Sequence, residues 1–396
     1  MKKFIMILLM FCGLVINGTA MVPSYYGARS LSLGYSSSAF TTDINSIFIN
    51  PAILNYNQNS MAGYQYQNSY LDVRNFSDNL SDILDTNLKN YAGLSENDKS
   101  VVFQKLKELY RYKTGIYGFS SSVPGFIGGK YGFSVSVVRT AILNPQNSTG
   151  TSIFEKDPQA VTNEEIAALK MNFLGLKYKQ FSLAYGLTIT QSVSIGVTLH
   201  YLTGKINDFD SSITDSIFIQ SANSRDYLEY GWKNAGSDGG KNFSRIMSDV
   251  GISMSLGSYV YAGVVMKNIG KAKISGPRQD IQLPRRITAG LAFRPDSQWG
   301  VYLDIDLKKE ELVWNGDGMQ PISIGIEKSF FKNKFFVRGG MLNDLSGKQF
   351  LGKESNALFG LGLGFNIGSV DIDAGIGLNS KGLVKNLAIS GFIITK

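Results

Sequence analysis

Residues 193–201 read VSIGVTLHY, and in this stretch apolar side chains occupy every second position. The apolar set comprises Val193, Ile195, Val197, Leu199 and Tyr201, and the intervening set comprises Ser194, Gly196, Thr198 and His200. Successive side chains of a β-strand point to opposite faces, so the pattern predicts a strand with one apolar face and one small, polar face. A single strand of this kind fits either a soluble sandwich or a membrane barrel. The number and length of similar segments decide between these folds.

Fourteen segments of this kind follow one another along the chain. They span about 60–70, 114–122, 130–143, 172–189, 192–206, 244–256, 258–269, 285–294, 298–308, 321–330, 334–342, 356–366, 369–379 and 386–395. Most run to about ten residues or more, the length that a tilted strand needs to cross a bilayer, whereas ordinary strands have about five or six. An even number of strands is typical of bacterial outer-membrane barrels made from one chain.

The connections between these segments alternate in length. Those after even-numbered segments are short, for example residues 190–191 and 295–297, and those after odd-numbered segments are longer, for example about 71–113 and 207–243. Short turns at one end and long loops at the other are typical of a barrel with periplasmic turns and extracellular loops. We therefore expect an all-β fold, a transmembrane antiparallel β-barrel of about 14 strands over residues 59–396. The alternative is a soluble sandwich or propeller, although no blade-length repeat is found.

The first twenty residues have the layout of a secretory signal peptide. A cationic start, Met1-Lys2-Lys3, precedes an uncharged apolar run over residues 4–16, and small residues lead to Ala20. This run is too short to span a bilayer as a helix. We expect residues 1–20 to be cleaved off after Ala20, which removes Cys12, the single cysteine, and marks the protein for export. A retained membrane anchor is the alternative.

The composition of the 396 residues excludes several classes of protein. One His and one Cys cannot supply a zinc or iron centre built on these residues, and a single cysteine cannot form a disulfide scaffold. Aromatic residues at 12% and charged residues at 18% argue against intrinsic disorder. The net charge of +8 is spread without a dense Lys/Arg cluster, so nucleic acid is not an expected partner. We expect no metal and no cofactor.

The first long connection contains an amphipathic helical pattern. Asp98-Lys99 precede Val102, Leu106 and Leu109, and charged residues occupy the other faces. The pattern predicts either a helix that caps the barrel mouth or an apolar landing site for a hydrophobic ligand.

Residues 21–58, before the first predicted strand, do not alternate. They contain GARSLSLG at residues 27–34 and then Asn50-Pro51-Ala52. This order resembles the mature N-terminus of the FadL/TodX-type outer-membrane transporters of hydrophobic compounds and of the related PorV-type barrels. The resemblance implies a barrel of about fourteen strands whose lumen is plugged by residues 21–58. The plug or gating candidates that it marks are Asn50, Pro51, Ala52 and Arg29.

A plug is also expected on physical grounds, because about eight strands already give an interior that side chains can fill and a barrel of this size is wider. Pro51 restricts its own φ and pushes Asn50 away from the helical region, which predicts a bend. The Asn50 amide can then bond backbone groups of the plug. The alternative is that these residues form an ordinary turn into the first strand.

Several ionisable side chains face the lumen by parity. They are Lys177, Lys179, His200, Asp249, Asp304, Asp306, Arg338, Asp371 and Asp373. A Lys or Arg that faces lipid near the midplane costs about 2–4 kcal/mol, which favours an inward direction. Mixed charges predict a salt-bridged, hydrated wall, and the alternative is that Lys177, Lys179 or Arg338 pairs with a ligand carboxylate. His200 is a further lumen candidate, but no local signature selects a serine partner, so we do not expect an enzyme.

The parity of the fourth segment slips. Its even-numbered apolar residues are Leu174, Leu176 and Tyr178, and its odd-numbered ones are Phe181, Leu183 and Tyr185. An extra residue near Lys179-Gln180 would explain the slip, which predicts a β-bulge. Such a bulge either fits the curvature of the wall or opens a gap for lateral release of a ligand into the membrane.

Together these features predict a passive channel in the outer membrane of a diderm bacterium for hydrophobic or amphipathic small molecules such as long-chain fatty acids. The expected partners are outer-membrane lipid, the ligand and the barrel assembly machinery. The alternative, which the resemblance implies, is a PorV-like role without transport, as a docking or shuttle component of a protein secretion system. KNIG at residues 267–270 and LPRR at residues 283–286 are similar to features of that branch.

Overall fold

The computed structural model describes most of the chain. The described residues are 19–20, 27–56, 59–73, 76–111, 115–146, 151–215, 229, 240–270, 273–278, 280–283, 285–312, 318–346, 357–378 and 384–395. Residues 1–18 of the predicted signal peptide lie outside them. Two small sheets are separate from the main one: β1 (Thr19–Ala20) with β13 (Glu310–Leu312) and β14 (Gly318–Met319), and β9 (Lys273–Ser275) with β10 (Asp280–Gln282).

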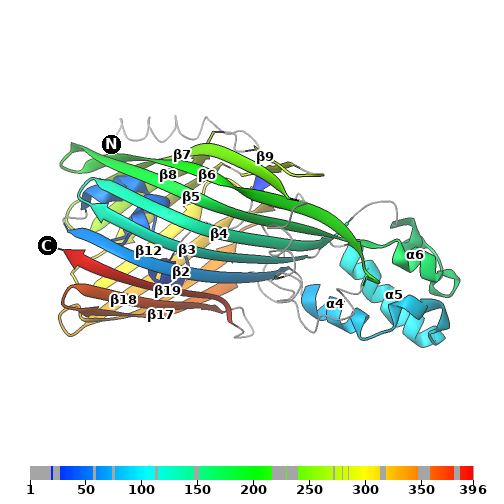
Figure 1. The fold of residues 1–396 in the computed structure, drawn as a ribbon. Coiled ribbons are helices and arrows are strands. Elements are labelled where there is room, and N and C mark those ends of the chain that lie inside the picture. The colour runs from blue at the N-terminus through cyan, green and yellow to red at the C-terminus, as the bar shows by residue number, and fades with distance from the viewer. Residues whose placement is uncertain are drawn as a thin grey trace.

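Fourteen antiparallel strands close into a barrel (Figure 1). They are β2 (Ser60–Val73), β3 (Gly115–Gly128), β4 (Tyr131–Pro145), β5 (Lys170–Thr190), β6 (Val193–Ser212), β7 (Lys241–Ser255), β8 (Val260–Ile269), β11 (Arg286–Phe293), β12 (Trp299–Asp306), β15 (Pro321–Phe330), β16 (Phe335–Asp344), β17 (Ala357–Ile367), β18 (Val370–Leu378) and β19 (Val384–Thr395). The last strand, β19, pairs with the first, β2, and closes the ring. Each strand overlaps one predicted segment, so the predicted strand number and the closure are confirmed.

The outer surface of the barrel is apolar and its interior is polar over much of its length, the inverse of a soluble protein. Along β6, Leu199 and Tyr201 are 52% and 45% exposed, whereas Thr198 and His200 are 0% and 3% exposed. The alternation in the sequence therefore separates an outer apolar face from an inner face of small and polar residues. A surface of this kind is suited to lipid.

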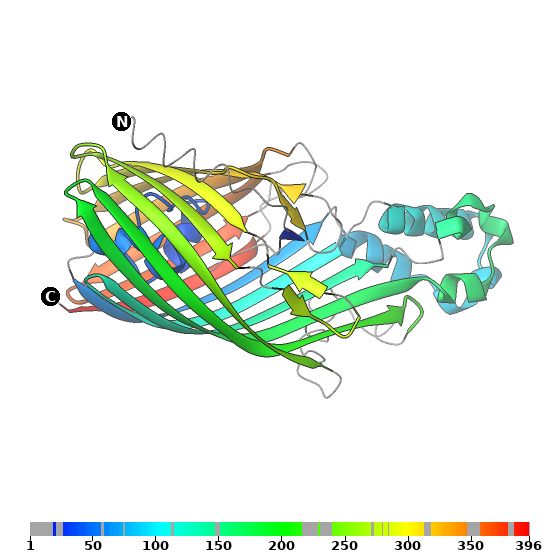
Figure 2. The same ribbon diagram turned by 90° about the horizontal axis from the view of Figure 1, so that it is seen from above.

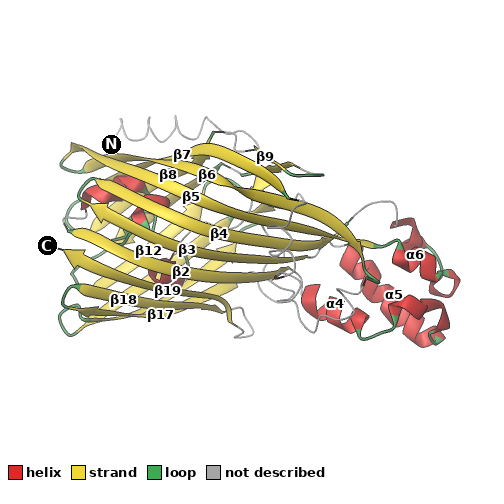
Figure 3. Cartoon of the chain, in the orientation of Figure 1, coloured by secondary structure: helices red, strands yellow, loops and turns green. Residues whose placement is uncertain are grey.

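The short connections lie at one end of the barrel and the long ones at the other (Figure 3). Gly129 turns the chain between β3 and β4, and Gly368 turns it between β17 and β18, with φ angles of 55° and 68° that favour glycine. The predicted alternation of connections is confirmed, and the C-terminus lies at the end with the short turns. This end faces the periplasm in outer-membrane barrels.

A group of helices lies at the opposite end. It consists of α4 (Phe76–Leu84), η2 (Leu88–Gly93), α5 (Glu96–Arg111), η3 (Thr151–Glu155), η4 (Pro158–Ala160) and α6 (Asn163–Ala167). Val102, Leu106 and Leu109 of α5 are buried in an apolar cluster with residues of α4 and of the neighbouring strand ends. These helices project beyond the strand ends and not across the barrel mouth, which does not fit the predicted cap (Figures 1 and 2). Among the described residues, no helix has the length and apolar character needed to span a bilayer.

The N-terminal segment, which we define as residues 27–56, lies inside the barrel near the short turns (Figure 2). It folds as α2 (Gly27–Ser32), a loop, α3 (Ser46–Ile49) and the 3-10 helix η1 (Pro51–Tyr56). Leu31, Ile44 and Ile47 are 0% exposed. The segment is therefore enclosed by the wall and is not an ordinary turn into β2.

The β5 strand does not contain the predicted bulge at Lys179-Gln180, because its register with β4 and β6 is continuous there. Lys177 and Lys179 are exposed and share the outward parity of Phe181, so their predicted inward direction is wrong. The parity does not change along β5. The inner face changes from polar to apolar, which produces the same slip in the sequence pattern.

Candidate functional site

Glycines of the barrel wall allow the N-terminal segment to pack closely against it. A Cβ atom at Gly196 of β6 would overlap the backbone of Pro51 and Ala52, and one at Gly251 of β7 would overlap the Asn50 side chain. Other wall glycines approach the segment in the same way: Gly263, Gly325, Gly340, Gly360 and Gly375. The wall and the segment are thus fitted to each other at the level of the backbone.

Asn50 joins two parts of the N-terminal segment and the wall. Its Nδ2 donates to the carbonyl oxygen of Ser38 at 2.9 Å and to that of Ile252 in β7 at 3.2 Å, and its Oδ1 accepts from the Ala52 N–H at 3.1 Å. Asn50 is extended, with φ −158° and ψ 105°, and ends α3, as the following Pro51 requires. The predicted bend and the predicted use of the amide are present.

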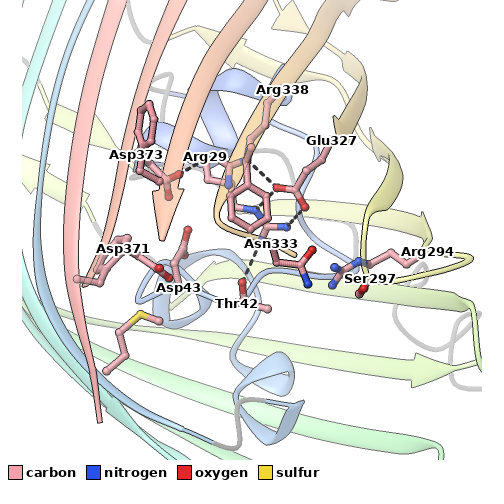
Figure 4. Close-up of a pocket in the computed structure, with 14 residues that line it drawn as sticks. Arg29, Thr42, Asp43, Arg294, Ser297, Glu327, Asn333, Arg338, Asp371 and Asp373 are labelled. Atoms are coloured by element: carbon pink, nitrogen blue, oxygen red, sulfur yellow. Dashed lines mark hydrogen bonds and ion pairs between the residues drawn. The ribbon is translucent and has the colours of Figure 1, made fainter. Parts of the chain in front are cut away.

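Charged side chains connect the N-terminal segment to the opposite side of the wall. Arg29 of α2 places Nε 3.1 Å from Glu327 Oε2 and Nη2 3.1 Å from Glu327 Oε1, a bidentate ion pair with β15. Glu327 Oε2 also accepts from Arg338 Nε of β16 at 2.6 Å, and Arg338 Nη1 pairs with Asp373 of β18. Tyr302 of β12 bonds both Arg29 and Glu327. These five residues form a buried network, which we call the ionic network, and Figure 4 shows its members Arg29, Glu327, Arg338 and Asp373.

A cavity of about 180 Å³ lies beside the ionic network (Figure 4). Its lining includes Asp43 and Thr42 of the N-terminal segment and Arg294 at the β11–β12 turn. Burial raises the pKa of the Asp43 carboxyl, and the nearby Arg29 charge opposes this rise. The cavity is therefore a polar space between segment and wall, too small for a long acyl chain. Among the described residues, no group of three or more His, Cys, Asp and Glu side chains could hold a metal ion.

A second anchor holds the loop between α2 and α3. Asp304 Oδ2 of β12 accepts from the Ser37 N–H at 2.9 Å, from the Ser38 N–H at 2.8 Å and from Ser38 Oγ at 2.7 Å. These three donors stabilise the charge on Oδ2 of the buried carboxylate. The loop is thereby tied to β12 through Ser37 and Ser38, and the Ser38 carbonyl oxygen also accepts from Asn50.

His200 lies on the inner face, as predicted, in a hydrogen-bonded row. Its Nδ1 is 2.8 Å from Ser182 Oγ, and its Nε2 is 3.1 Å from Asp249 Oδ2. Gln180 Nε2 is 3.0 Å from the same Nδ1, and the Phe48 ring stacks on the imidazole with centroids 6.1 Å apart. The order Ser–His–Asp is that of a hydrolytic triad, but the two imidazole nitrogens are exchanged, and Ser182 and His200 are 1% and 3% exposed beneath the N-terminal segment. The arrangement fits a wall residue that supports the segment.

The inner face of β4 to β7 differs in polarity between the two ends of the barrel. Nearer the short turns, the buried inward residues are Ser134, Ser136, Gln180, Ser182, Ser194, Thr198, His200, Asp249 and Ser253. Nearer the long connections, most of them are apolar, namely Val138, Ile142, Leu174, Leu176, Leu202, Ile206, Phe243 and Met247, which we call the apolar lumen wall, and Thr140 and Asp208 are polar exceptions. The N-terminal segment meets the apolar lumen wall through Ile44, Ile47 and Phe48. A hydrophobic surface thus runs from the helix end of the barrel down to the segment.

The ladder between β3 and β4 is interrupted near Pro124. Ser122 pairs with Val137 and Gly125 with Ser134, but the two positions between them are unpaired at an unchanged register. Ser134 Oγ donates to the Pro124 carbonyl oxygen at 3.0 Å across the gap. Proline lacks an N–H group, so it weakens a ladder at its position. The hydrogen-bond ladder of the wall is therefore interrupted here and not at the bulge predicted in β5.

The structure brings together some of the predicted residues and separates others. Arg29 and Arg338 share the ionic network, Asn50, Pro51 and Ala52 form the contact with β6 and β7, and His200 lies beneath Phe48. Lys177 and Lys179 are on the outer surface. The sequence reasoning missed Glu327 and Tyr302, although Glu327 is directly opposite Arg338 in the register of β15 and β16.

No protein-family model matches the chain, and no curated protein sequence matches it significantly. Among solved structures, a Pseudomonas aeruginosa FadL homologue matches with 11% identity over 95% of this chain and 99% of that one, at a TM-score of 0.53. The Ralstonia pickettii toluene transporter TbuX matches with 13% identity over 93% and 97%, at 0.50. A deletion mutant of the monoaromatic hydrocarbon channel TodX matches with 13% identity over 94% and 98%, at 0.51. The chain therefore shares the fold of these outer-membrane barrels, which confirms the expected resemblance at that level.

Proposed function

We propose that the protein is a passive channel for hydrophobic or amphipathic small molecules in the outer membrane of a diderm bacterium. The observation that carries the proposal is the apolar lumen wall. The interior of a water-filled pore is polar, because polar solutes cross it in hydrated form. An apolar inner face toward the extracellular end instead offers a surface on which a hydrophobic solute leaves water, which supplies the free energy for capture. The shared fold with transporters of toluene and with a FadL homologue is consistent with this function.

The N-terminal segment is the proposed gate of this channel. It lies directly beneath the apolar lumen wall and is held by Asn50 on one side and by the ionic network on the other. Movement of the corner at Pro51 and Ala52 would break contacts with β6 and β7 and open a path past the segment. Asn50, Pro51, Ala52 and Arg29 are therefore the proposed gating residues.

Neutral or weakly polar ligands fit the lumen better than a ligand that needs a buried cation. Arg338 already pairs with Glu327 and Asp373, so a fatty-acid carboxylate would have to displace a carboxylate of the protein. The acyl chains of long-chain fatty acids match the apolar lumen wall. Monoaromatic compounds match it equally well. Competition between a labelled fatty acid and toluene for uptake into liposomes that contain the barrel distinguishes these ligands.

The test is uptake of a labelled hydrophobic solute into liposomes that contain the purified barrel. In the variant L176N/I206N, polar side chains replace Leu176 and Ile206, which are directly paired in the apolar lumen wall. The matched control L183A/L199A shortens Leu183 and Leu199, which are directly paired on the outer surface of the same two strands. We expect at least a tenfold loss of uptake for the first variant and little change for the second.

Heat-modifiable migration on gels verifies that both variants have folded into barrels. Equal uptake by L176N/I206N and the wild-type protein would show that the solute does not follow the apolar lumen wall. Uptake of a small hydrophilic sugar as fast as the hydrophobic solute would also contradict the proposal, because it would indicate a water-filled pore.

A docking or shuttle role in protein secretion is the second candidate. The observation that favours it is the group of helices that projects beyond the strand ends. This group has its own apolar core, which stabilises it as a surface outside the membrane. α4 and α5 are held together by an ion pair of 2.8 Å between Asp82 and Lys105. Recovery of large protein partners in mild detergent, lost on removal of residues 76–111, together with wild-type uptake by L176N/I206N, would favour this role.

A further inference from the structure

Four cations gather on the outer surface of the barrel, on three neighbouring strands. Arg139 of β4, Lys177 and Lys179 of β5 and Lys205 of β6 make up this group, which we call the cation ladder. Arg139 pairs in register with Lys177, and Lys177 pairs with Lys205 on its other side. Directly paired residues of antiparallel strands point to the same face with Cβ atoms about 4.5–5.5 Å apart. Three positive charges therefore stand side by side across the wall.

The cation ladder lies at one edge of the apolar band that faces lipid. Below it on β5, the outward residues from Phe181 to Ile189 are all exposed and, apart from Tyr185, purely hydrocarbon. Eight residues of a tilted strand rise by roughly 20 Å, close to the height of the apolar band of a membrane barrel. Above Phe181 the outward positions become Lys179 and Lys177. The cations thus stand at the headgroup level, at the end with the long connections and hence in the outer leaflet.

Like charges directly opposite on neighbouring strands destabilise a sheet unless an anion lies between them. By parity, the outward positions of β4, β5 and β6 hold four cations and no carboxylate over the described residues. Arg139, Lys177 and Lys179 are exposed and Lys205 is half-buried, so their charges are open to a ligand from the membrane side. A ligand that fits must combine anionic groups at the headgroup level with acyl chains for the band below.

We propose that the cation ladder binds the phosphate groups of lipid A, the phosphorylated glycolipid anchor of lipopolysaccharide, in the outer leaflet. Arg139 offers a planar fork that suits phosphate oxygens, and the three lysines offer further point charges within reach of the same headgroup. The acyl chains lie against the outward face of β5 and β6, along Phe181, Leu183 and Leu199. The inference rests on the proposed outer-membrane location and is independent of transport.

The experiment measures lipid binding to the full chain in nanodiscs of phosphatidylcholine. The probes are bisphosphorylated lipid A and the same lipid with both phosphates removed, so that only the phosphate differs. We expect the wild-type protein to bind the phosphorylated form roughly tenfold to a hundredfold more tightly, since each basic residue near an anionic headgroup contributes to binding. The variant K177Q/K179Q/K205Q should lose most of this preference.

The matched control is K130Q/K332Q/K334Q, which removes three exposed lysines from the short turns at the other end of the barrel. It has the same change in net charge and should keep the wild-type preference. Equal binding of the two lipids by the wild-type protein would overturn the proposal, and this comparison needs no variant. Loss of preference in the control would overturn it too, by indicating a general effect of net charge. Displacement of the lipid by inorganic phosphate at equal phosphate concentration would show a site for free phosphate instead.

Discussion

Arg29 and Glu327, 298 positions apart in the sequence, form a bidentate ion pair inside the barrel. One partner belongs to the N-terminal segment and the other to the wall, so the pair fixes where the first helix docks. Glu327 also pairs with Arg338, so the two arginines share this carboxylate, and Arg338 has a second carboxylate partner in Asp373. The docking of the segment is thus sensitive to one residue of β15.

Glu327→Gln should destabilise the barrel more than Arg29→Gln. The first change leaves the buried guanidinium of Arg29 facing a neutral amide and leaves Arg338 with Asp373 as its carboxylate partner, and loss of a partner from a buried pair costs about 3–5 kcal/mol. The second change leaves Glu327 with Arg338 as a partner and should cost less. The measurement is the temperature at which heat-modifiable migration is lost. Equal effects of the two changes would show that Arg338 does not rely on Glu327.

Asn50→Ala should loosen the gate without unfolding the wall. It removes hydrogen bonds to Ser38, Ile252 and Ala52, each worth about 0.5–1.5 kcal/mol net. We expect more frequent channel openings in planar bilayers and faster protease cleavage within residues 27–56. Asn68→Ala, at an exposed outward position of β2, is the control and should behave like the wild-type protein. Wild-type conductance in N50A would argue against a gating role for this corner.

Gly196→Ala should push the N-terminal segment away from β6, because the new methyl group overlaps the backbone of Pro51 and Ala52. Overpacking of this kind costs about 1–3 kcal/mol. The control is Gly391→Ala in β19, where a Cβ atom meets no other atom within 4 Å. Protease access to the segment should rise in G196A only. If both variants keep the segment protected, the close fit of wall and segment is not what holds it.

The strands could be predicted because the pattern that specifies them is local. Period-two alternation over ten residues, as in 193–201, needs no knowledge of the partner strand, and the length of the run separates a membrane barrel from a sandwich. The ionic network could not be predicted in the same way. Glu327 meets Arg29 only through the position of α2 inside the closed ring, which depends on contacts spread over the whole chain.

The error at Lys177 and Lys179 has a physical cause. Outward residues are apolar only where the strand crosses the hydrocarbon, and a strand that leaves it enters a charged headgroup region. The inner face of β5 changes in the opposite sense at the same level, from Gln180 and Ser182 to Leu176 and Leu174. When the polarity of the outer and inner faces reverses at the same level of a strand, the reversal therefore indicates the membrane boundary. A bulge would instead shift the register with the neighbouring strand.

Pro124→Val tests whether ligands leave sideways through the interrupted ladder between β3 and β4. Valine supplies the N–H that proline lacks and favours a regular strand, so the β3–β4 ladder can form at the two unpaired positions. If release is lateral, uptake of a hydrophobic solute should fall several-fold while the stability of the barrel stays the same or rises. Pro145→Val, at the end of β4 where the ladder with β5 is already made, is the control and should not change uptake. Unchanged uptake in P124V, with the strand closed as judged by slower amide exchange at this position, would place the exit along the barrel axis past the N-terminal segment.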